Sequence, residues 1–289
     1  MPDLPPLYKY LDVQGARLTL GNRTFKHSKP SDFNDTEELT IRSIFPESTE
    51  TALVEIKNGL PDILLKHLDE APTGGSVQMR HKIGLIQGIY RNNPGAAKII
   101  GEGMRRTPIS DIYDLDRMRE TFREFVTEIN DLRQRYRILC VSEIRDSDKM
   151  WVRYAQCHEG IVVRIVPNAQ KDSKFQKFRK VEYREARPPL YESALSFYED
   201  SQFGDQEKIK KALLDKIIYT KTREWEEEKE YRLAIWLGEG EEWSTLSYHS
   251  EEISELYLGQ KMADEVKREI VGLARAVNPE MHIFFPMGV

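Results

Sequence analysis

The sequence predicts an α+β fold, and two patterns in it support that class. Residues of about 47–136 place apolar side chains three or four positions apart, which is typical of amphipathic helices. The residues on either side carry short alternating or wholly apolar runs bounded by turn residues, which are typical of strands. Helices and strands therefore tend to occupy separate blocks instead of regular βαβ units. We expect one domain over residues 1–289, with about 47–136 as a helical insertion within it.

In chain order, residues 7–42 predict short strands, because apolar and β-branched runs are separated there by turn residues such as Gly21 and Asn22. The clearest helix is expected after Ser110 and Asp111, a favourable N-cap pair, and continues to Tyr136. The predicted strands cover residues 7–11, 17–20, 24–27, 137–142, 161–165, 229–237, 243–248, 254–258 and 282–285. The further predicted helices cover residues 148–157, 190–200, 206–218 and 266–277.

Composition and charge exclude several classes of protein. Its 48 acidic and 43 basic side chains give a net charge of −5, so no overall field draws it to nucleic acid or to an anionic membrane. Two cysteines make no disulfide framework, and no run approaches the roughly 18 apolar residues of a membrane span. The first residues lack the basic start and apolar stretch of a signal peptide. We expect a cytoplasmic protein that makes no membrane contact.

The pattern most indicative of chemistry lies in residues 221–237. There Glu226, Glu228, Glu230 and Arg232 stand at every second position, so an extended backbone places them on one face. Neighbouring carboxylates repel one another and need a cationic or hydroxylic partner. Arg232 supplies one partner, and a bound ligand could supply the rest. The alternative is a solvated edge strand or a charged helical turn.

Three further segments combine polar and aromatic residues. Lys9 alternates with Leu7 and Leu11, so its ammonium needs an anionic partner or a ligand, unless it reaches water from an edge strand. Residues 28–35 form a polar turn, for which a purely structural role is the alternative. Trp151 and His158 share a helical stripe with Tyr154 or Ala155, which fits a core equally well.

Several common site chemistries have no motif in this chain. The six histidines are scattered, and no spaced cysteine or histidine pairs are present, so no metal site is expected. A P-loop, a dinucleotide-binding glycine turn and a nucleophile elbow are likewise absent from the sequence.

Four motifs, in their order along the chain, resemble a bacterial family of unknown function. They are L-Y-K-Y at residues 7–10, S-x-P-x-x-F-N-D at 28–35, M-W-x-x-Y-A-x-x-H-x-G at 150–160 and W-x-x-E-x-E-x-R at 225–232. Members of that family are found among phage-defence and abortive-infection genes, and the family resembles the ADP-ribosyltransferase superfamily. This chain departs from the pattern at Thr36, where proline is usual, and at Arg153, where histidine is frequent.

The resemblance implies a split β core like that of ADP-ribosyltransferases, and NAD as a substrate. It implies that Glu230 binds the ribose and stabilises an oxocarbenium-like state, that Glu228 orients the acceptor, and that Arg232 fixes the carboxylates or meets the pyrophosphate. The residues implied to contact NAD are Tyr8, Lys9, Ser28, Asn34, Trp151, Tyr154 and Trp225. Two alternatives remain: a non-catalytic sensor or binding module on the same fold, and a metal-dependent nuclease using Asp35 with Glu228 or Glu230.

The expected acceptor is a macromolecule. Between Lys171 and Lys180 the chain holds five cations and two phenylalanines against one acid, a pattern that can follow phosphates and stack on unpaired bases. RNA or single-stranded DNA is therefore a candidate acceptor. The alternative is a solvated loop whose phenylalanines anchor it to the core, and a protein acceptor remains open. The defence setting suggests a toxin, with an antitoxin protein as a possible partner.

Overall fold

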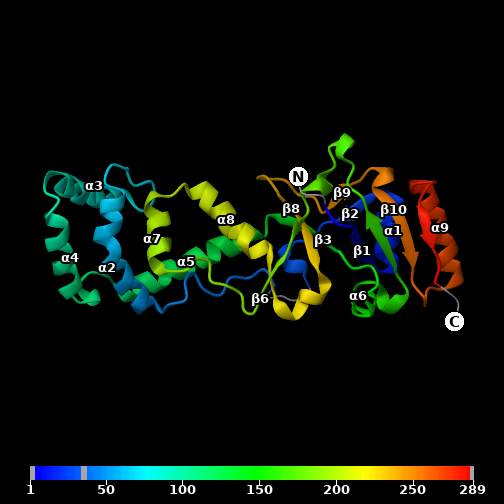
Figure 1. Cartoon of the computed structure of the whole chain (residues 1–289), viewed down its shortest axis with the longest axis horizontal. Coiled ribbons are helices and arrows are strands. Elements are labelled where there is room, and N and C mark those ends of the chain that lie inside the picture. The colour runs from blue at the N-terminus through cyan, green and yellow to red at the C-terminus, as the bar shows by residue number, and fades with distance from the viewer. Residues whose placement is uncertain (1–3, 34–37, 287–289) are drawn as a thin grey trace. The chain divides into compact units, whose positions relative to one another are not determined.

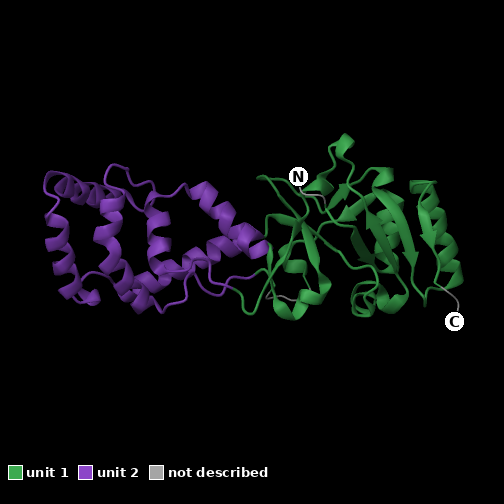
Figure 2. Cartoon of the chain, in the orientation of Figure 1, with its two compact units in different colours: residues 1–39, 134–187, 219–289 green, residues 40–133, 188–218 purple. Residues whose placement is uncertain are grey.

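The computed structural model describes residues 4–33 and 38–286, which form two compact units (Figure 2). The sheet unit consists of residues 1–39, 134–187 and 219–289, and the helical unit of residues 40–133 and 188–218. The helical unit thus combines most of the predicted helical insertion with a second segment that the sequence pattern did not join to it. The mixed α and β composition agrees with the predicted class.

In the described residues, the sheet unit contains a mixed seven-stranded sheet in the order β11-β10-β4-β1-β3-β8-β5 (Figure 1). Its strands are β1 (Leu7–Leu11), β3 (Tyr136–Ser142), β4 (Ile161–Ile165), β5 (Arg179–Lys180), β8 (Glu230–Trp236), β10 (Ile253–Leu258) and β11 (His282–Phe284). Neighbours are antiparallel except β10 and β11, which are parallel. Two smaller pairs join β2 (Thr24–Lys26) to β9 (Thr245–Ser247) and β6 (Glu182–Arg184) to β7 (Thr220–Thr222).

Helices α1 (Val13–Asn22) and α9 (Asp264–Val277) pack on the same side of this sheet. Their apolar stripes, with Ala16 and Leu20 on α1, join a buried cluster that includes alternate strand residues such as Leu139 and Val163. Alternation along a strand sends every second side chain to one face, so this cluster forms the main core of the unit.

The sheet parts between β1 and β3. In the described residues, β1 pairs with β4 over five positions and β3 with β8 over seven, but β1 and β3 share one paired position, Tyr8 with Ser142. Further along β3, Ser28 forms an isolated bridge with Ile138. The edge of β3 at Cys140 therefore faces a gap between these two contacts.

Local capping explains two of the differences between the predicted and the observed elements. Residues 17–20, expected to be a strand, belong to α1, because Asp12 caps the helix by accepting a hydrogen bond from the Gly15 amide. Helix α5 (Leu115–Arg133) begins four residues after Asp111, since Asp114 accepts hydrogen bonds from the amides of its first turn. Local capping decided both boundaries.

The helical unit contains α2 (Thr49–Lys66), α3 (Val77–Asn92), α4 (Ala96–Arg106), α5, α7 (Ala194–Phe203) and α8 (Gln206–Ile218). Serine caps start α2, α3 and α7. Phe45, Phe122 and Phe197 pack edge to face or tilted, with ring centroids 5.2 to 5.9 Å apart. None of the helices in the described ranges combines the length and apolar character needed to cross a bilayer.

A tight turn follows α6 (Asp148–Tyr154) and rests on the end of β10. Gln156, Cys157 and His158 all have left-handed backbone angles, with φ of 50°, 51° and 71°. The Gly259 amide donates to the Gly160 carbonyl at 2.9 Å, and a Cβ at Gly259 would lie 2.1 Å from the His158 carbonyl oxygen. Only glycine fits at Gly259 without moving the turn.

Replacing Gly259 with alanine should lower the free energy of unfolding by about 3 kcal/mol, because the added methyl meets backbone that cannot move away cheaply. The matched control is Gly272→Ala on α9, where a Cβ would have no atom within 4 Å. That change should raise stability by up to about 1 kcal/mol through helix propensity. Urea unfolding of both variants checks the contrast, and equal effects would contradict it.

Candidate functional site

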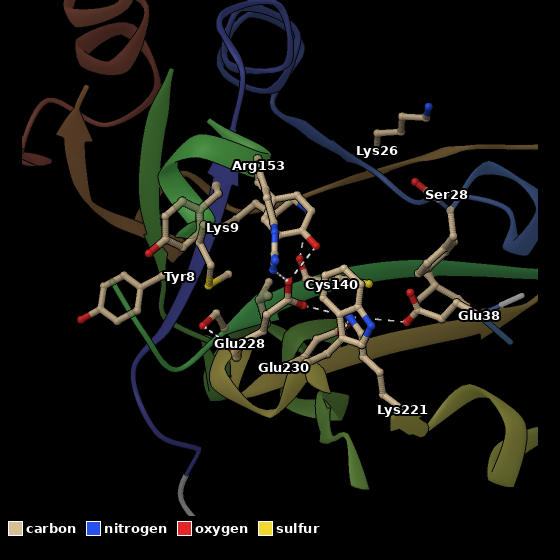
Figure 3. A pocket seen from close by; sticks show the side chains of 18 of the residues that line it. Tyr8, Lys9, Lys26, Ser28, Glu38, Cys140, Arg153, Lys221, Glu228 and Glu230 are labelled. Atoms are coloured by element: carbon tan, nitrogen blue, oxygen red, sulfur yellow. Dashed lines mark hydrogen bonds and ion pairs between the residues drawn. The ribbon is translucent and has the colours of Figure 1, made fainter. Parts of the chain in front are cut away.

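A pocket of about 500 Å³ lies where β1 and β3 part, and every residue that lines it belongs to the sheet unit (Figure 3). The lining residues are Tyr8, Lys9, Tyr10, Lys26, Ser28, Asp32, Phe33, Glu38, Ile138, Cys140, Val141, Ser142, Met150, Arg153, Tyr154, Lys221, Trp225, Glu228 and Glu230. Its volume is within the usual range for a small-molecule site.

The carboxylates of this pocket are arranged differently from the predicted alternating face. Residues Arg223–Glu228 form a 3₁₀ turn, η6, and Lys229 ends it with a left-handed φ of 41°. Glu226 therefore remains exposed, and the prediction that it shares a strand face was wrong. The turn nevertheless brings Glu228 back to Glu230, the first residue of β8, and both accept hydrogen bonds from Lys221 Nζ, at 2.8 and 2.9 Å.

Arg232 completes this arrangement beneath the pocket. Its side chain is fully buried, and Nε donates to Glu230 Oε1 at 2.7 Å while a terminal nitrogen donates to Glu38 Oε1. Glu38, Lys221, Glu228, Glu230 and Arg232, called here the charged cluster, are all more than nine-tenths buried. Three carboxylates face two cations in it, so the cluster itself carries one net negative charge.

Mutual attraction keeps Glu230 and Lys221 ionised. Burial alone would raise the pKa of Glu230, but the charges of Arg232 and Lys221 outweigh it and hold that pKa well below its usual range. Burial alone would lower the pKa of Lys221, but the charge of Glu230, followed by those of Glu38 and Glu228, holds it above its usual range. A fixed carboxylate thus lines the pocket at neutral pH.

Helix α6 supplies the side chains next to Glu228. Tyr154 Oη donates to Glu228 Oε1 at 2.9 Å, and burial followed by the charge of Glu228 raises the pKa of Tyr154 above its usual value. The Arg153 guanidinium lies 3.4 Å from Glu228 and 4.7 Å from the centroid of the Trp225 ring. Lys221 Nζ lies 4.9 Å from the same centroid. Stacking of a nicotinamide on Trp225 would therefore compete with cations already in place.

Lys9 reaches into the gap between the strands. Its Nζ donates to the Cys140 carbonyl at 3.0 Å, and burial lowers the pKa of Lys9. Among residues 4–33 and 38–286, Lys9 forms no direct ion pair, although the charge of Glu230 partly offsets the effect of burial on its pKa. An anionic partner in direct contact is thus missing from the described residues, and Lys9 lines the pocket where a ligand could supply one.

Most of the predicted site residues converge. Those that line the pocket are Tyr8, Lys9, Ser28, Tyr154, Trp225, Glu228 and Glu230, and Arg232 lies behind Glu230. Trp151 does not join them, because its ring stacks on His158 at 5.6 Å and lines another cavity. Asn34 and Asp35 lie outside the described residues.

Sequence reasoning missed Lys221, Glu38, Arg153 and Cys140 as members of the site. A clue existed for Lys221, because it opens the same charged segment and its neighbours in β7 are threonines typical of a strand. Nothing in the local pattern around Glu38 indicates that it meets Arg232, which lies far away in the sequence.

The basic segment ending at Lys180 differs from the expectation for a base-stacking surface. Phe175 and Phe178 are buried in the main core and stack on each other, with centroids 5.8 Å apart. These rings cannot receive bases, so that part of the prediction was wrong. The cations are exposed, although Lys171 pairs with Glu251.

Replacing Arg232 with methionine should lower the free energy of unfolding by about 3–5 kcal/mol, because Glu38 and Glu230 lose their buried counterion. The control is Arg268→Met on the exposed face of α9, which should change stability by no more than about 0.5 kcal/mol. Denaturant titration checks this, and an Arg232 variant as stable as the control would contradict it.

The depressed pKa of Glu230 predicts an acid-sensitive contribution to stability. A carboxyl with a lower pKa in the folded state stabilises at pH values above its unfolded pKa of about 4.5, and this contribution is lost as pH falls towards the folded pKa. Between about pH 5 and pH 3, wild-type stability should therefore fall more steeply than that of Glu230→Gln. The exposed-site control Glu226→Gln should keep the wild-type slope, and equal slopes in all three proteins would refute the assignment.

The comparisons with known proteins concern the same segment. A family model described as "Protein of unknown function (DUF2971)" matches residues 150–233, which begin within α6, include η6 and end within β8. No curated protein and no solved structure matches the chain. The segment that supplies Tyr154, Glu228 and Glu230 to the pocket is therefore similar to a family whose function is not established.

Proposed function

We propose that this chain is an NAD-consuming enzyme of the ADP-ribosyltransferase type, acting in the cytoplasm as a bacterial toxin or anti-phage effector on a macromolecule. The observation that supports this most is the pair of carboxylates, Glu228 and Glu230, held side by side by Lys221 in a pocket of ligand size. The pocket lies where β1 and β3 part, so a ligand has room beside these carboxylates.

In the proposed reaction, the bond between ribose and nicotinamide breaks, and its electron pair leaves with the nicotinamide. The ribose carbon gains positive charge, which a carboxylate fixed beforehand stabilises without reorganisation. Glu230 suits this role because Arg232 and Lys221 hold it in place and keep it ionised. A carboxylate has about four acceptor positions, and Arg232 and Lys221 occupy three of them on Glu230. The fourth partner is the Cys140 thiol, a weak donor that a ribose hydroxyl would replace.

The remaining residues fit complementary roles. The acceptor, or water, attacks the ribose carbon and gives up a proton, and Glu228 is the carboxylate beside Glu230 that would take it. Tyr154 orients Glu228 through its hydroxyl hydrogen bond. Lys9 lines the same pocket without a direct ion pair among the described residues, which supports a role in binding a phosphate of the pyrophosphate.

The alternatives receive less support. A metal-dependent nuclease would need carboxylates free to bind the metal, whereas Glu228 and Glu230 are both engaged by Lys221. In the described ranges, no group of three His, Cys, Asp or Glu side chains is arranged to hold a metal ion. A non-catalytic binding module would bind NAD in the same pocket and leave it intact. Cleavage of NAD by the protein would therefore distinguish the proposed enzyme from a binding module.

The test is release of nicotinamide from NAD by the purified protein. Glu230→Gln should reduce the rate by about a hundredfold or more, because the charge opposite the ribose is lost. Glu226→Gln, which alters a neighbouring exposed carboxylate of η6, should leave the rate unchanged.

Thermal unfolding of each variant distinguishes lost chemistry from lost folding. Should Glu230→Gln fail to fold, Tyr154→Phe replaces it, since that change removes one hydrogen bond to Glu228 and leaves the Lys221 contacts in place. Folded Glu230→Gln within tenfold of wild type, or wild-type protein that leaves NAD intact, would overturn the proposal.

A further inference from the structure

The helical unit leaves one side of α3 uncovered. On the inner side of this helix, Ile83 and Tyr90 join a buried cluster with residues of α2 and α4. On the opposite side, Val77, Leu85 and Ile89 are 73%, 57% and 48% exposed. They stand eight and four residues apart, so they lie along the same side of the helix. Single exposed apolar residues are ordinary on a protein surface, whereas a line of them along one helix is typical of a contact surface.

Two glycines lie among these apolar side chains. Gly84 and Gly88 are one turn apart on the same side of α3, and a Cβ at either position would meet no neighbouring atom within 4 Å. Packing within the chain therefore gives no reason for glycine, which destabilises the middle of a helix relative to alanine. Glycine does allow the backbone of a second element to approach closely. The side of α3 that holds Val77, Gly84, Leu85, Gly88 and Ile89 is called here the α3 outer face.

The charged side chains of α3 are all basic. The helix contains Arg80, Lys82 and Arg91 and no aspartate or glutamate. In the part of the chain that the structure describes, none of these three cations forms an ion pair. Cations of α5, in the same unit, do have carboxylate partners, as Arg123 has in Glu120. The charge of α3 is therefore not neutralised by the rest of its unit.

These cations flank the α3 outer face along both edges. Lys82 lies seven residues before Ile89, and residues seven apart stand almost in line along a helix. On the other edge, Arg80 lies four residues before Gly84 and Arg91 seven residues after it. An apolar strip between two rows of unpaired cations is complementary to an apolar strip between two rows of carboxylates.

The composition of the α3 outer face distinguishes between anionic and apolar partners. A second copy of the chain would bring like charges together across a symmetric contact. Single-stranded nucleic acid would need exposed aromatic rings, whereas the tyrosine of α3, Tyr90, is 1% exposed. A lipid surface would take large apolar side chains at Gly84 and Gly88, where the helix has none. A narrow strip with glycines at its centre instead fits a single helix.

We propose that the α3 outer face binds an acidic amphipathic helix of a partner protein. Apolar residues of that helix pack against Leu85 and Ile89 and approach the backbone at the two glycines. Carboxylates on both sides of its apolar strip pair with the cations that flank the α3 outer face. The proposal concerns the helical unit and does not depend on NAD chemistry.

The experiment uses the full chain and a fluorescein-labelled peptide of three Leu-Glu-Glu-Ala-Leu-Glu-Glu repeats, titrated by fluorescence anisotropy at low salt. The apolar residues of this peptide recur every three or four positions, with glutamates on both sides. The wild type should bind it with a Kd of about 0.1 mM or tighter. A matched peptide with glutamine in place of glutamate should bind at least about tenfold more weakly, and added salt should weaken binding of the acidic peptide.

Two variants locate the site. Gly88→Leu fills the open position between the apolar side chains, and Lys82→Glu reverses a flanking charge, so each should weaken binding of the acidic peptide at least about fivefold. The matched controls are Gly272→Leu on α9, where a Cβ would also meet no neighbouring atom within 4 Å, and Lys177→Glu at an exposed position of the sheet unit. Both controls should bind as the wild type does. Thermal unfolding checks that the variants fold, and Gly88→Leu should be at least as stable as the wild type through its higher helix propensity.

The result is separable from that of the NAD assay, because Glu230→Gln should bind the peptide as the wild type does. Equal affinity for the glutamine peptide, absence of binding at about 1 mM, or wild-type affinity in both variants of α3 would overturn the proposal. Binding of the full chain to phosphatidylglycerol vesicles that Gly88→Leu strengthens would assign the α3 outer face to a lipid surface. A dimer that Gly88→Leu dissociates would assign it to a second copy of the chain.

Discussion

The burial of Arg232 is the constraint on which the sheet unit depends. A guanidinium fully removed from water must keep its counterions, and it does so through Glu230 on its own strand and Glu38, which is remote in sequence. Lys221 then links Glu230 to Glu228. The loop before the helical unit, β7, η6 and β8 are therefore held together by charges that cannot be removed singly without leaving another uncompensated.

The same constraint shapes the pocket. Glu230 begins β8 opposite Ser142, whose hydroxyl donates to the Glu228 carbonyl at 2.6 Å and so attaches η6 to the end of β3. On the other edge of β3, the parting from β1 would leave the Cys140 carbonyl without a strand partner, and Lys9 satisfies it. One side of β3 is thus tied down by the charged cluster, and the other is open to a ligand.

The strands were predictable to a large extent because their pattern is local. An apolar run such as Ile161–Ile165 must be buried on both faces, and its neighbours in the sheet show that it is. The failures are equally local in cause. The alternation of apolar and polar residues at 17–20 is weak and fits a strand or a helix. The helix forms because Asp12 caps it and because Ala16 and Leu20, one turn apart, are both buried.

By itself, the sequence determined the class of fold, most strands and the candidate carboxylates, because periodicity and residue type are properties of short segments. The sequence pattern predicted that Glu228 and Glu230 lie together on an unbroken strand. They do lie together, but a 3₁₀ turn and the left-handed backbone of Lys229 bring them there. Only the tertiary structure decided that Glu38 and Lys221 complete the charged cluster and that Trp151 faces a different cavity. Such contacts join residues distant in the chain, and their energy comes from burial and charge pairing, which no local pattern encodes.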